Sequence, residues 1–202
     1  GVALAGFLNL ASAGVVAAYL VLQALYNGAL KRIPVADVFG LSLGFLLRAG
    51  LGAIAIGVAI SPWLLFCTAS LALLLGFSKR RNEYLAVEHD PGETRPVLGG
   101  YSKSALDAFV LVSAAVAAIC YGIYSIQSPT ASAHPALFLT TPFVFYGICR
   151  YLYLVFTFDE GGEPESILLR DRHIWASVLA FVAMAALAMR GLELPWIEGI
   201  GK

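Results

Sequence analysis

The residues best suited to chemistry begin a long polar interval, residues 79–103, which lies between two apolar runs. Lys79 and Glu83 are four residues apart, so a helix would place them on one face, with Arg80 beside Lys79. Two cations and a carboxylate at a helix end can hold a phosphate group together with a metal ion or a hydroxyl group. The same pattern is typical of a basic membrane anchor with an intrahelical ion pair. The sequence leaves both interpretations open.

Further along this interval, Arg95, Tyr101 and Lys103 add two cations and a phenol. Residues 91–92 (Pro-Gly) and 99–100 (Gly-Gly) are typical of turns. Connections longer than about 12–15 residues are usually functional or disordered. We therefore expect Arg95 and Tyr101 to bind substrate, and a solvated connection is the alternative.

Arg48 is the strongest single candidate on physical grounds, because it lies inside an apolar run, residues 35–60. An arginine in the interior of a membrane span costs at least about 2.5–3.5 kcal/mol on insertion scales. It must therefore face a polar cavity or a partner. We predict that Arg48 lines a cavity and binds phosphate; the alternative is a structural contact with backbone carbonyls of a neighbouring helix.

Arg150 lies about two helical turns from the end of a later apolar run, with tyrosines around it, Tyr153 among them. A guanidinium group matches the geometry of phosphate, so we predict that Arg150 and Tyr153 bind substrate. Snorkelling of the arginine to the membrane interface is the alternative. Lys31, which follows Tyr26 at the end of the first run, is also predicted to bind substrate. Its alternative role is a basic stop after an interfacial aromatic residue.

Other titratable residues give weaker signals. The acidic residues of the second charged interval are expected to be solvated: Asp159, Glu160, Glu163, Glu165 and Asp171. The cysteines lie inside apolar runs and the histidines lie in or beside loops, without the spacing of metal ligands. The sequence therefore predicts no metal site built from these residues.

Composition identifies the environment in which these residues must work. The chain has 202 residues, of which 59% are hydrophobic and 13% charged, against roughly 25% charged in soluble domains. The mean hydropathy is +0.81. These values indicate a membrane protein. The formal net charge is zero, so the charge balance gives no indication of nucleic-acid binding.

Hydropathy predicts an all-α, polytopic transmembrane bundle of about six helices, with residues 1–202 as one domain. The first span covers residues 2–26, or begins near Leu10 if Asn9 ends an earlier span. The others are expected at residues 35–60, 64–77, 105–126, 136–156 and 174–188. With alternating spans, nine lysines and arginines fall on one side and two on the other. By the positive-inside rule, the charged intervals are cytoplasmic.

Several short motifs follow one another along nearly the whole chain. They are Tyr26…Lys31-Arg32-Ile33-Pro34…Asp37, Gly44-Phe45-x-Leu47-Arg48-Ala49, Ser61-Pro62-Trp63, Lys79-Arg80-Arg81-x-Glu83, Arg95-Pro96-Val97-Leu98, Tyr101-Ser102, Tyr146-Gly147-x-x-Arg150-Tyr151-Leu152-Tyr153, Pro164-Glu165 and Leu168-Leu169-Arg170-Asp171-Arg172. Their order and spacing resemble the UbiA-type membrane prenyltransferase superfamily. The later motifs resemble the branch that contains decaprenyl-phosphate phosphoribosyltransferase.

The resemblance implies a fold of nine membrane helices around a cavity, of which the six spans match helices four to nine. It also implies a first acidic motif of the NDxxDxxxD type that binds Mg²⁺ and diphosphate, and this sequence has no such motif. We therefore expect the chain to be the C-terminal two-thirds of a family member, with the Mg²⁺ ligands mainly outside it. Where members that prenylate aromatic compounds carry a second acidic motif, this chain has the basic residues that start at Lys79.

The resemblance implies transfer of a 5-phosphoribosyl group from phosphoribosyl diphosphate to a polyprenyl phosphate, with decaprenyl phosphate as the family example. Basic side chains in place of carboxylates suit an acceptor that is itself a phosphate. Glu83 is then the predicted catalytic residue, which orients a hydroxyl group or a cation. The implied location is the bacterial inner membrane, and the implied pathway is cell-wall biosynthesis.

Two alternatives stay open from the sequence. One is prenyl transfer from a prenyl diphosphate to an aromatic or other small acceptor. The other is an inactive or partner-dependent membrane fragment. The sequence also leaves open whether the protein is a homo-oligomer.

Overall fold

The computed structural model describes residues 10–58, 61–89, 96–159, 161–162 and 164–191, and every regular element in these ranges is a helix. The elements are α2 (Leu10–Gly28), η1 (Leu30–Arg32), α3 (Ala36–Ile56), α4 (Pro62–His89), η2 (Pro96–Gly100), α5 (Lys103–Gln127), α6 (Pro129–Ala133), η3 (Pro135–Thr140), α7 (Thr141–Thr157), α8 (Pro164–Arg170) and α9 (Arg172–Met189). Six helical segments are long and apolar enough to cross a membrane. The predicted all-α bundle of six spans is confirmed, and the protein is a multi-pass membrane protein.

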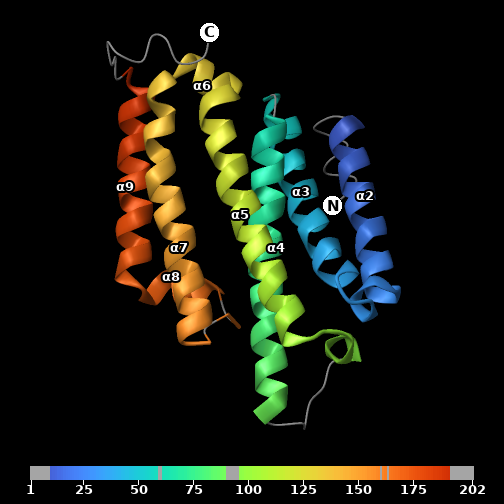
Figure 1. The fold of residues 1–202 in the computed structure, drawn as a ribbon. Coiled ribbons are helices and arrows are strands. Elements are labelled where there is room, and N and C mark those ends of the chain that lie inside the picture. Colours follow the sequence, from blue (N-terminus) through green and yellow to red (C-terminus); the bar gives the residue numbers. More distant parts are fainter. Residues whose placement is uncertain (1–9, 59–60, 90–95, 160, 163, 192–202) are drawn as a thin grey trace.

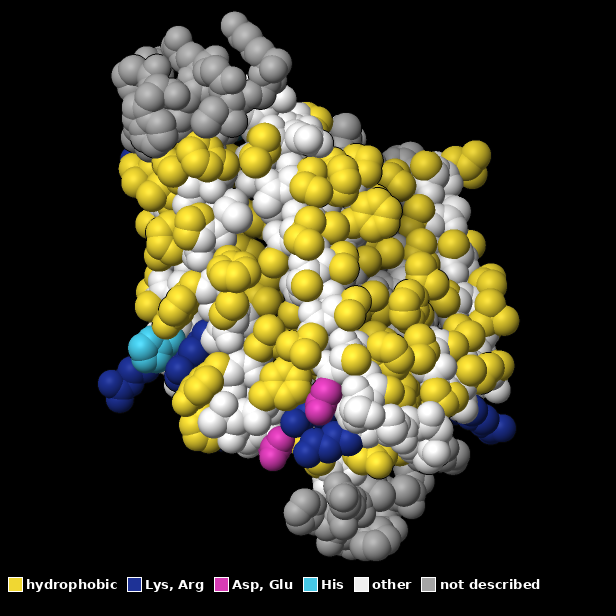
Figure 2. Space-filling model, viewed as in Figure 1, with side chains coloured by type: hydrophobic (Ala, Val, Ile, Leu, Met, Phe, Trp, Pro, Cys, Tyr) yellow, Lys and Arg dark blue, Asp and Glu magenta, His cyan; other side chains and the backbone are white. Residues whose placement is uncertain are grey.

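The long helices run side by side and alternate in direction (Figure 1). The connections from α2 to α3, from α4 to α5 and from α7 to α9 lie at the lower end in this view. We call this the charged end, because Lys31, Lys103 and Arg170 lie in or beside these connections, and Lys79 lies in the half of α4 that leads to one of them. In Figure 2, hydrophobic side chains cover the middle of the visible face, and charged side chains gather towards its lower end. The bundle thus has an apolar belt and one polar end.

The bounds of one span differ clearly from the prediction. The third span was expected to end at residue 77, before the basic residues, but α4 continues as one helix to His89. The prediction ended the span where the charged residues begin. Arg80 and Arg81 are buried in ion pairs with other helices, so the charges do not interrupt the helix. The other spans agree with the prediction within a few residues, except that the fifth begins with the short helix η3.

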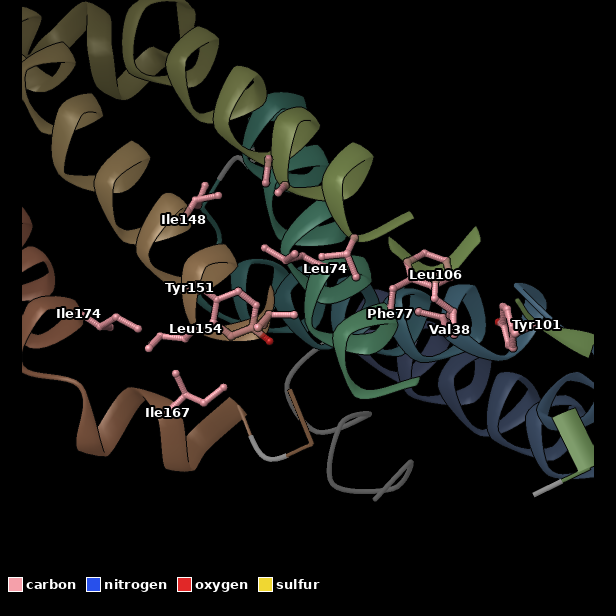
Figure 3. Close-up of a cluster of buried hydrophobic side chains, with 14 of the residues drawn as sticks. Val38, Leu74, Phe77, Tyr101, Leu106, Ile148, Tyr151, Leu154, Ile167 and Ile174 are labelled. Carbon is pink, nitrogen blue, oxygen red and sulfur yellow. The ribbon is translucent and has the colours of Figure 1, made fainter. Parts of the chain in front are cut away.

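The buried core connects α3, α4, α5 and α7 (Figure 3). Leu74 and Phe77 on α4 pack with Val38 of α3 and Leu106 of α5. On α5, the buried side chains recur at helical spacing: Leu106, Val110, Ala114, Ala117 and Tyr121. In a bilayer such faces associate through close packing rather than through exclusion of water. The contact between α4 and α5 is the most extensive in the bundle, which makes α4 the central support for the charged end.

Three local features set the helix starts at the charged end. Ser102 caps α5 by accepting a hydrogen bond from the N–H of Ala105 at 3.3 Å. Asp171 caps α9 by accepting one from the N–H of Ile174 at 2.9 Å. At the start of α3, Val35 has φ 68° and ψ −49°, and the N–H of Ala36 donates to the carbonyl of Pro34 at 2.8 Å. This is a γ-turn of the strained kind, centred on a β-branched residue.

Candidate functional site

Four residues from three parts of the chain form what we call the Arg80 cluster: Asp37, Arg80, Glu83 and Tyr101. Arg80 Nε lies 2.6 Å from Asp37 Oδ2, and Arg80 Nη1 lies 2.5 Å from Glu83 Oε2. The Tyr101 hydroxyl donates to Asp37 Oδ1 at 2.8 Å. The structure therefore brings together three predicted site residues, Arg80, Glu83 and Tyr101, around an aspartate that was not in the predicted set.

The members of the Arg80 cluster differ in how exposed they are to solvent. Asp37 is fully buried, and Arg80 is 3% exposed. The Glu83 side chain is 22% exposed and is thus the part of the cluster nearest to solvent. Burial, with the Asp37 carboxylate beside the phenol, raises the pKa of Tyr101 above its usual value. The phenol therefore stays protonated and remains a hydrogen-bond donor.

The γ-turn at Val35 is hydrogen-bonded to the Arg80 cluster. The Tyr101 oxygen accepts a hydrogen bond from the N–H of Val35 at 2.5 Å, while its own hydrogen goes to Asp37. Strained backbone of this kind costs of order 1–3 kcal/mol and persists only where surrounding contacts hold it. Tyr101 is one such contact, so the residue that binds Asp37 also holds the turn that precedes it.

On another side of α4, Arg81 forms a second set of ion pairs, the Arg81 cluster of Arg81, Asp107 and Asp159. Arg81 Nε lies 2.6 Å from Asp107 Oδ1, and Nη1 lies 2.8 Å from Asp159 Oδ1. Nη1 also donates to the carbonyl of Val155 at 3.0 Å. The guanidinium lies over the ring of Phe156, 4.8 Å from its centroid. Arg81 thus joins α4 to α5 and to the end of α7.

The segment after α7 is held close to α4 by backbone contacts as well. The Asn82 amide donates to the carbonyl of Asp159 at 2.5 Å. A Cβ atom at Gly161 would lie only 2.7 Å from the Ser78 carbonyl oxygen, so no larger residue fits there without a shift. A polar pocket of about 360 Å³ lies beside this contact, with Asn82 and Arg170 in its lining. None of the predicted site residues lines this pocket.

Arg150 forms an ion pair with Asp171, in which Nη2 lies 2.7 Å and Nε 3.1 Å from Oδ2. Its guanidinium lies 5.0 Å from the ring centroid of Tyr153. The hydrogen bond from Arg150 lowers the pKa of Asp171 below its usual value, because it stabilises the carboxylate. Asp159 and Asp171 were expected to be solvated. Asp159 is 61% exposed and therefore solvated, although it also pairs with Arg81. For Asp171 the expectation was wrong, because its side chain is 12% exposed and forms an ion pair with Arg150.

The remaining predicted residues lie apart from these clusters. Arg48 donates to the Tyr19 hydroxyl at 2.7 Å and lies 5.2 Å from the ring centroids of Tyr19 and Phe45. Its recorded partners are therefore aromatic side chains of α2 and α3. Lys31 and Lys79 are exposed at the charged end, and Arg95 lies outside the described residues. The structure thus separates Arg48, the Arg80 cluster and Arg150 into three groups.

An apolar pocket of about 360 Å³ lies between α4, α7 and α9. Leu71, Leu75, Phe143, Val144, Val178 and Phe181 are among the residues that line it. Pockets of this kind bind hydrocarbon groups. It is separate from the three arginine groups, since none of the predicted site residues contributes to its lining.

The residues that sequence reasoning missed are acidic. Asp37 lies 43 residues before its partner Arg80, and Asp107 lies 26 residues after its partner Arg81. One sequence signal points to them: each is a lone carboxylate within or at the edge of an apolar run, where an unpaired charge is costly. In the described part of the chain, no group of three or more His, Cys, Asp or Glu side chains could hold a metal ion.

Comparison with known proteins finds relatives that share one name. The decaprenyl-phosphate phosphoribosyltransferase of Mycolicibacterium smegmatis is 30% identical over 183 residues, which are 87% of this chain and 57% of the relative. The protein of that name from Corynebacterium glutamicum is 30% identical and matches 90% of this chain and 55% of its own length. The one from Mycobacterium tuberculosis is 30% identical, with 87% and 57% covered.

The chain is related to these phosphoribosyltransferases. The resemblance that its motifs indicated is thereby confirmed. The chain spans little more than half the length of these curated relatives. No family model matches the chain. The matched part of the phosphoribosyltransferases extends over 87% of this chain or more, so it includes most of the membrane-spanning helices described above.

Proposed function

We propose that this protein takes part in the transfer of a 5-phosphoribosyl group from phosphoribosyl diphosphate to a polyprenyl phosphate, as the membrane-embedded part of a transferase. The observation that carries the proposal is the similarity to proteins named decaprenyl-phosphate phosphoribosyltransferase along 87–90% of this chain. Prenyl transfer to an aromatic acceptor has no comparable support among the reported relatives.

The charged end supplies the groups for the phosphates. Lys79 is exposed beside the Arg80 cluster, so an anion can reach it without breaking an ion pair. Arg80 uses Nε and Nη1 for carboxylates, and an anion would approach it from the side of the partly exposed Glu83. We assign phosphate binding to Lys79 and Arg80, and we assign to Glu83 the orientation of a ribose hydroxyl group.

The proposed reaction does not require a strong general base. An oxygen of the polyprenyl phosphate forms a bond to the anomeric carbon of the ribose, and the bond from that carbon to the diphosphate breaks with its electron pair. The attacking phosphate is already ionised at neutral pH, so no proton has to be removed first. The contribution of the protein is therefore positioning and stabilisation of charge in a partly dry site.

The apolar helices suit the lipid substrate. We propose that part of the isoprenoid chain lies in the apolar pocket between α4, α7 and α9, whose lining is hydrocarbon and aromatic. The phosphate of the lipid would then lie towards the charged end. Following the positive-inside rule, we place the charged end in the cytoplasm and the protein in the bacterial inner membrane. A lipid-linked pentose phosphate suits cell-wall biosynthesis.

The proposal includes Mg²⁺, and the ligands for this ion would lie outside the described residues. The described residues do not fit a Mg²⁺ site, because they contain no group of three or more suitable side chains. Asp37, the most buried carboxylate of the Arg80 cluster, is already bonded to Arg80 and Tyr101. No step of the transfer is assigned to the metal here.

The test is transfer of radiolabel in membranes that contain the protein as it occurs in its cell. We expect label from phosphoribosyl diphosphate to enter a lipid extract when polyprenyl phosphate is added. A parallel reaction contains labelled prenyl diphosphate and 4-hydroxybenzoate. Label in the lipid product of the first reaction alone supports the proposal. Label transferred only in the second reaction, or in neither, contradicts it.

A further inference from the structure

We propose that Asp37 is a positioning residue of this site: it fixes the Arg80 guanidinium through Nε, so that the opposite edge of the group is held ready for a substrate phosphate. The inference rests on the function proposed above and adds to it a residue that touches no substrate. It concerns how Arg80 is aimed, since an arginine side chain has several rotatable bonds and is useful only when it is held in one orientation.

Asp37 is bonded through both carboxylate oxygens. Oδ2 accepts from Arg80 Nε at 2.6 Å, and Oδ1 accepts from the Tyr101 hydroxyl at 2.8 Å. The residue is fully buried, so water does not compete for either oxygen. A carboxylate with both oxygens engaged in a dry environment cannot rotate without losing a hydrogen bond. Asp37 is therefore a fixed point.

The backbone beside Asp37 is fixed as well. The strained turn at Val35, two residues before Asp37, leads into α3, and the Val35 N–H donates to the oxygen of Tyr101. Tyr101 thus restrains both the carboxylate and the turn that positions it. Strained backbone that is held by its surroundings is often found where a side chain must be aimed.

The two carboxylates that bind Arg80 differ in a way that suits an incoming anion. Asp37 is fully buried, whereas the Glu83 side chain is 22% exposed. The two bonds use different edges of the guanidinium, because Asp37 binds Nε and Glu83 binds Nη1. A phosphate that displaces Glu83 from Nη1 would leave the Nε bond intact. Arg80 would then exchange one partner while Asp37 continues to hold it.

Positioning and simple electrostatics predict opposite effects for Asp37→Asn. If only charge mattered, loss of a negative group beside Arg80 would strengthen the binding of a phosphate and lower KM. Under the positioning proposal, the amide replaces one acceptor oxygen with an NH2 donor, so it no longer accepts from both Arg80 and Tyr101 at their present positions, and Arg80 turns towards Glu83. The KM for phosphoribosyl diphosphate then rises.

The experiment compares Asp37→Asn with Asp107→Asn in the full protein, using the labelled-transfer assay at several concentrations of phosphoribosyl diphosphate. Asp107 is the matched control, because it also binds an α4 arginine through Nε at 2.6 Å, but this arginine is Arg81. We expect kcat/KM to fall about a hundredfold in Asp37→Asn, because a small misplacement of a binding group can lower the rate by about this factor. Most of the loss is expected in KM, since Arg80 binds phosphate in both ground and transition states. Asp107→Asn is expected to keep kcat/KM within about threefold.

A double-mutant cycle separates positioning from general damage. If Asp37 acts through Arg80, adding Asp37→Asn to an Arg80→Gln protein lowers kcat/KM no further. An equal further loss in that background overturns the inference. So does an unchanged or lowered KM in the single variant. If Asp37→Asn yields no folded protein, Tyr101→Phe takes its place in the cycle; it frees Oδ1 of Asp37, and a KM that does not rise overturns the inference.

The outcome also distinguishes this inference from the proposed function. If the unaltered protein transfers no phosphoribosyl group, the proposed function is wrong and the inference fails with it. If the unaltered protein is active and Asp37→Asn has the kinetics of the Asp107→Asn control, only the inference fails.

Discussion

Arg80 and Arg81 are neighbours on α4 with nearly equal burial, yet the structure gives them different surroundings. Each is less than 5% exposed and each has two carboxylate partners. The Arg80 cluster contains a fully buried aspartate and a buried tyrosine. The partners in the Arg81 cluster are 31% and 61% exposed, and Arg81 also bonds to a backbone carbonyl and faces an aromatic ring.

The two clusters differ in how easily water can replace an ion pair. The carboxylates around Arg81 can be hydrated where they stand, so Arg81 acts mainly as a tie between α4, α5 and α7. Asp37 is fully buried, and among the described residues its charge is paired with Arg80, while the Tyr101 hydroxyl donates a hydrogen bond to it. A buried charge without its partner is far more costly than an exposed one. The Arg80 cluster therefore combines a fixed interior with one partly exposed member, Glu83.

The largest effect is expected for Arg80→Leu compared with Arg81→Leu. Arg80→Leu leaves the Asp37 charge buried and is expected to lower the free energy of unfolding by about 3–5 kcal/mol. Arg81→Leu is expected to lower it by about 1–2 kcal/mol, because Asp107 and Asp159 can be hydrated. Unfolding in mixed SDS and detergent micelles measures both. Equal losses would show that the two clusters do not differ as described.

The next effect concerns Gly100, which lies where η2 approaches the segment before α3. A Cβ atom at Gly100 would overlap the ring of Pro34, whereas one at Gly99 would meet nothing within 4 Å. Gly100→Ala is expected to cost about 1–3 kcal/mol by overpacking. The control, Gly99→Ala, is expected to change stability by less than about 0.5 kcal/mol. If both variants are as stable as the unaltered protein, Gly100 does not pack against Pro34 as closely as described.

Tyr101→Phe is expected to cost about 1 kcal/mol, since it removes a hydrogen bond to Asp37 and one from Val35. It also changes the response to alkali. The pKa of Tyr101 is raised in the folded state, so its contribution is fully present below the ordinary value of 10 and is lost as the pH rises above it. Between pH 10 and about pH 12 the variant should lose less stability than the unaltered protein. Parallel pH curves would contradict this.

The smallest effect is expected for Asp171→Asn. Asparagine can still cap α9, but the ion pair with Arg150 is lost, at about 0.5–1 kcal/mol near neutral pH. The pKa of Asp171 is lowered in the folded state, so its contribution is present above the ordinary value of 3.8 and is lost as the pH falls below it. The gap between the two proteins should therefore close in acid. A gap of constant size from pH 6 to about pH 3 would contradict the role of the ion pair.

The sequence predicted the spans well because hydropathy reports directly on burial in lipid. The alternating apolar runs and the basic residues between them gave the six helices and the single charged end. The same reasoning placed the end of the third span too early. The span was ended where the basic residues begin, although an arginine also fits inside a bundle when acidic partners reach it, as Asp37 and Asp107 do.

The site was harder to predict than the spans. The spacing of Lys79 and Glu83 suggested a shared face, but the observed ion pair joins Arg80 and Glu83, three residues apart. The partners that complete the clusters, Asp37 and Asp159, lie 43 and 78 residues from their arginines. Such pairs depend on how helices pack, and local spacing does not encode this. The roles of Lys31, Arg48 and Arg150 in binding substrate stay predictions.

The account depends most directly on Lys79, the exposed cation beside the Arg80 cluster. Its removal should disturb no ion pair described here, so a change in activity reports on substrate rather than on folding. The decisive measurement is kcat/KM for phosphoribosyl transfer by Lys79→Ala, with Lys103→Ala, another exposed lysine at the charged end, as the control. The account predicts a loss of about tenfold or more for Lys79→Ala, as expected for a charged hydrogen bond to substrate, and no change for the control. Unaltered kcat/KM in Lys79→Ala, or an equal loss in both variants, would contradict it.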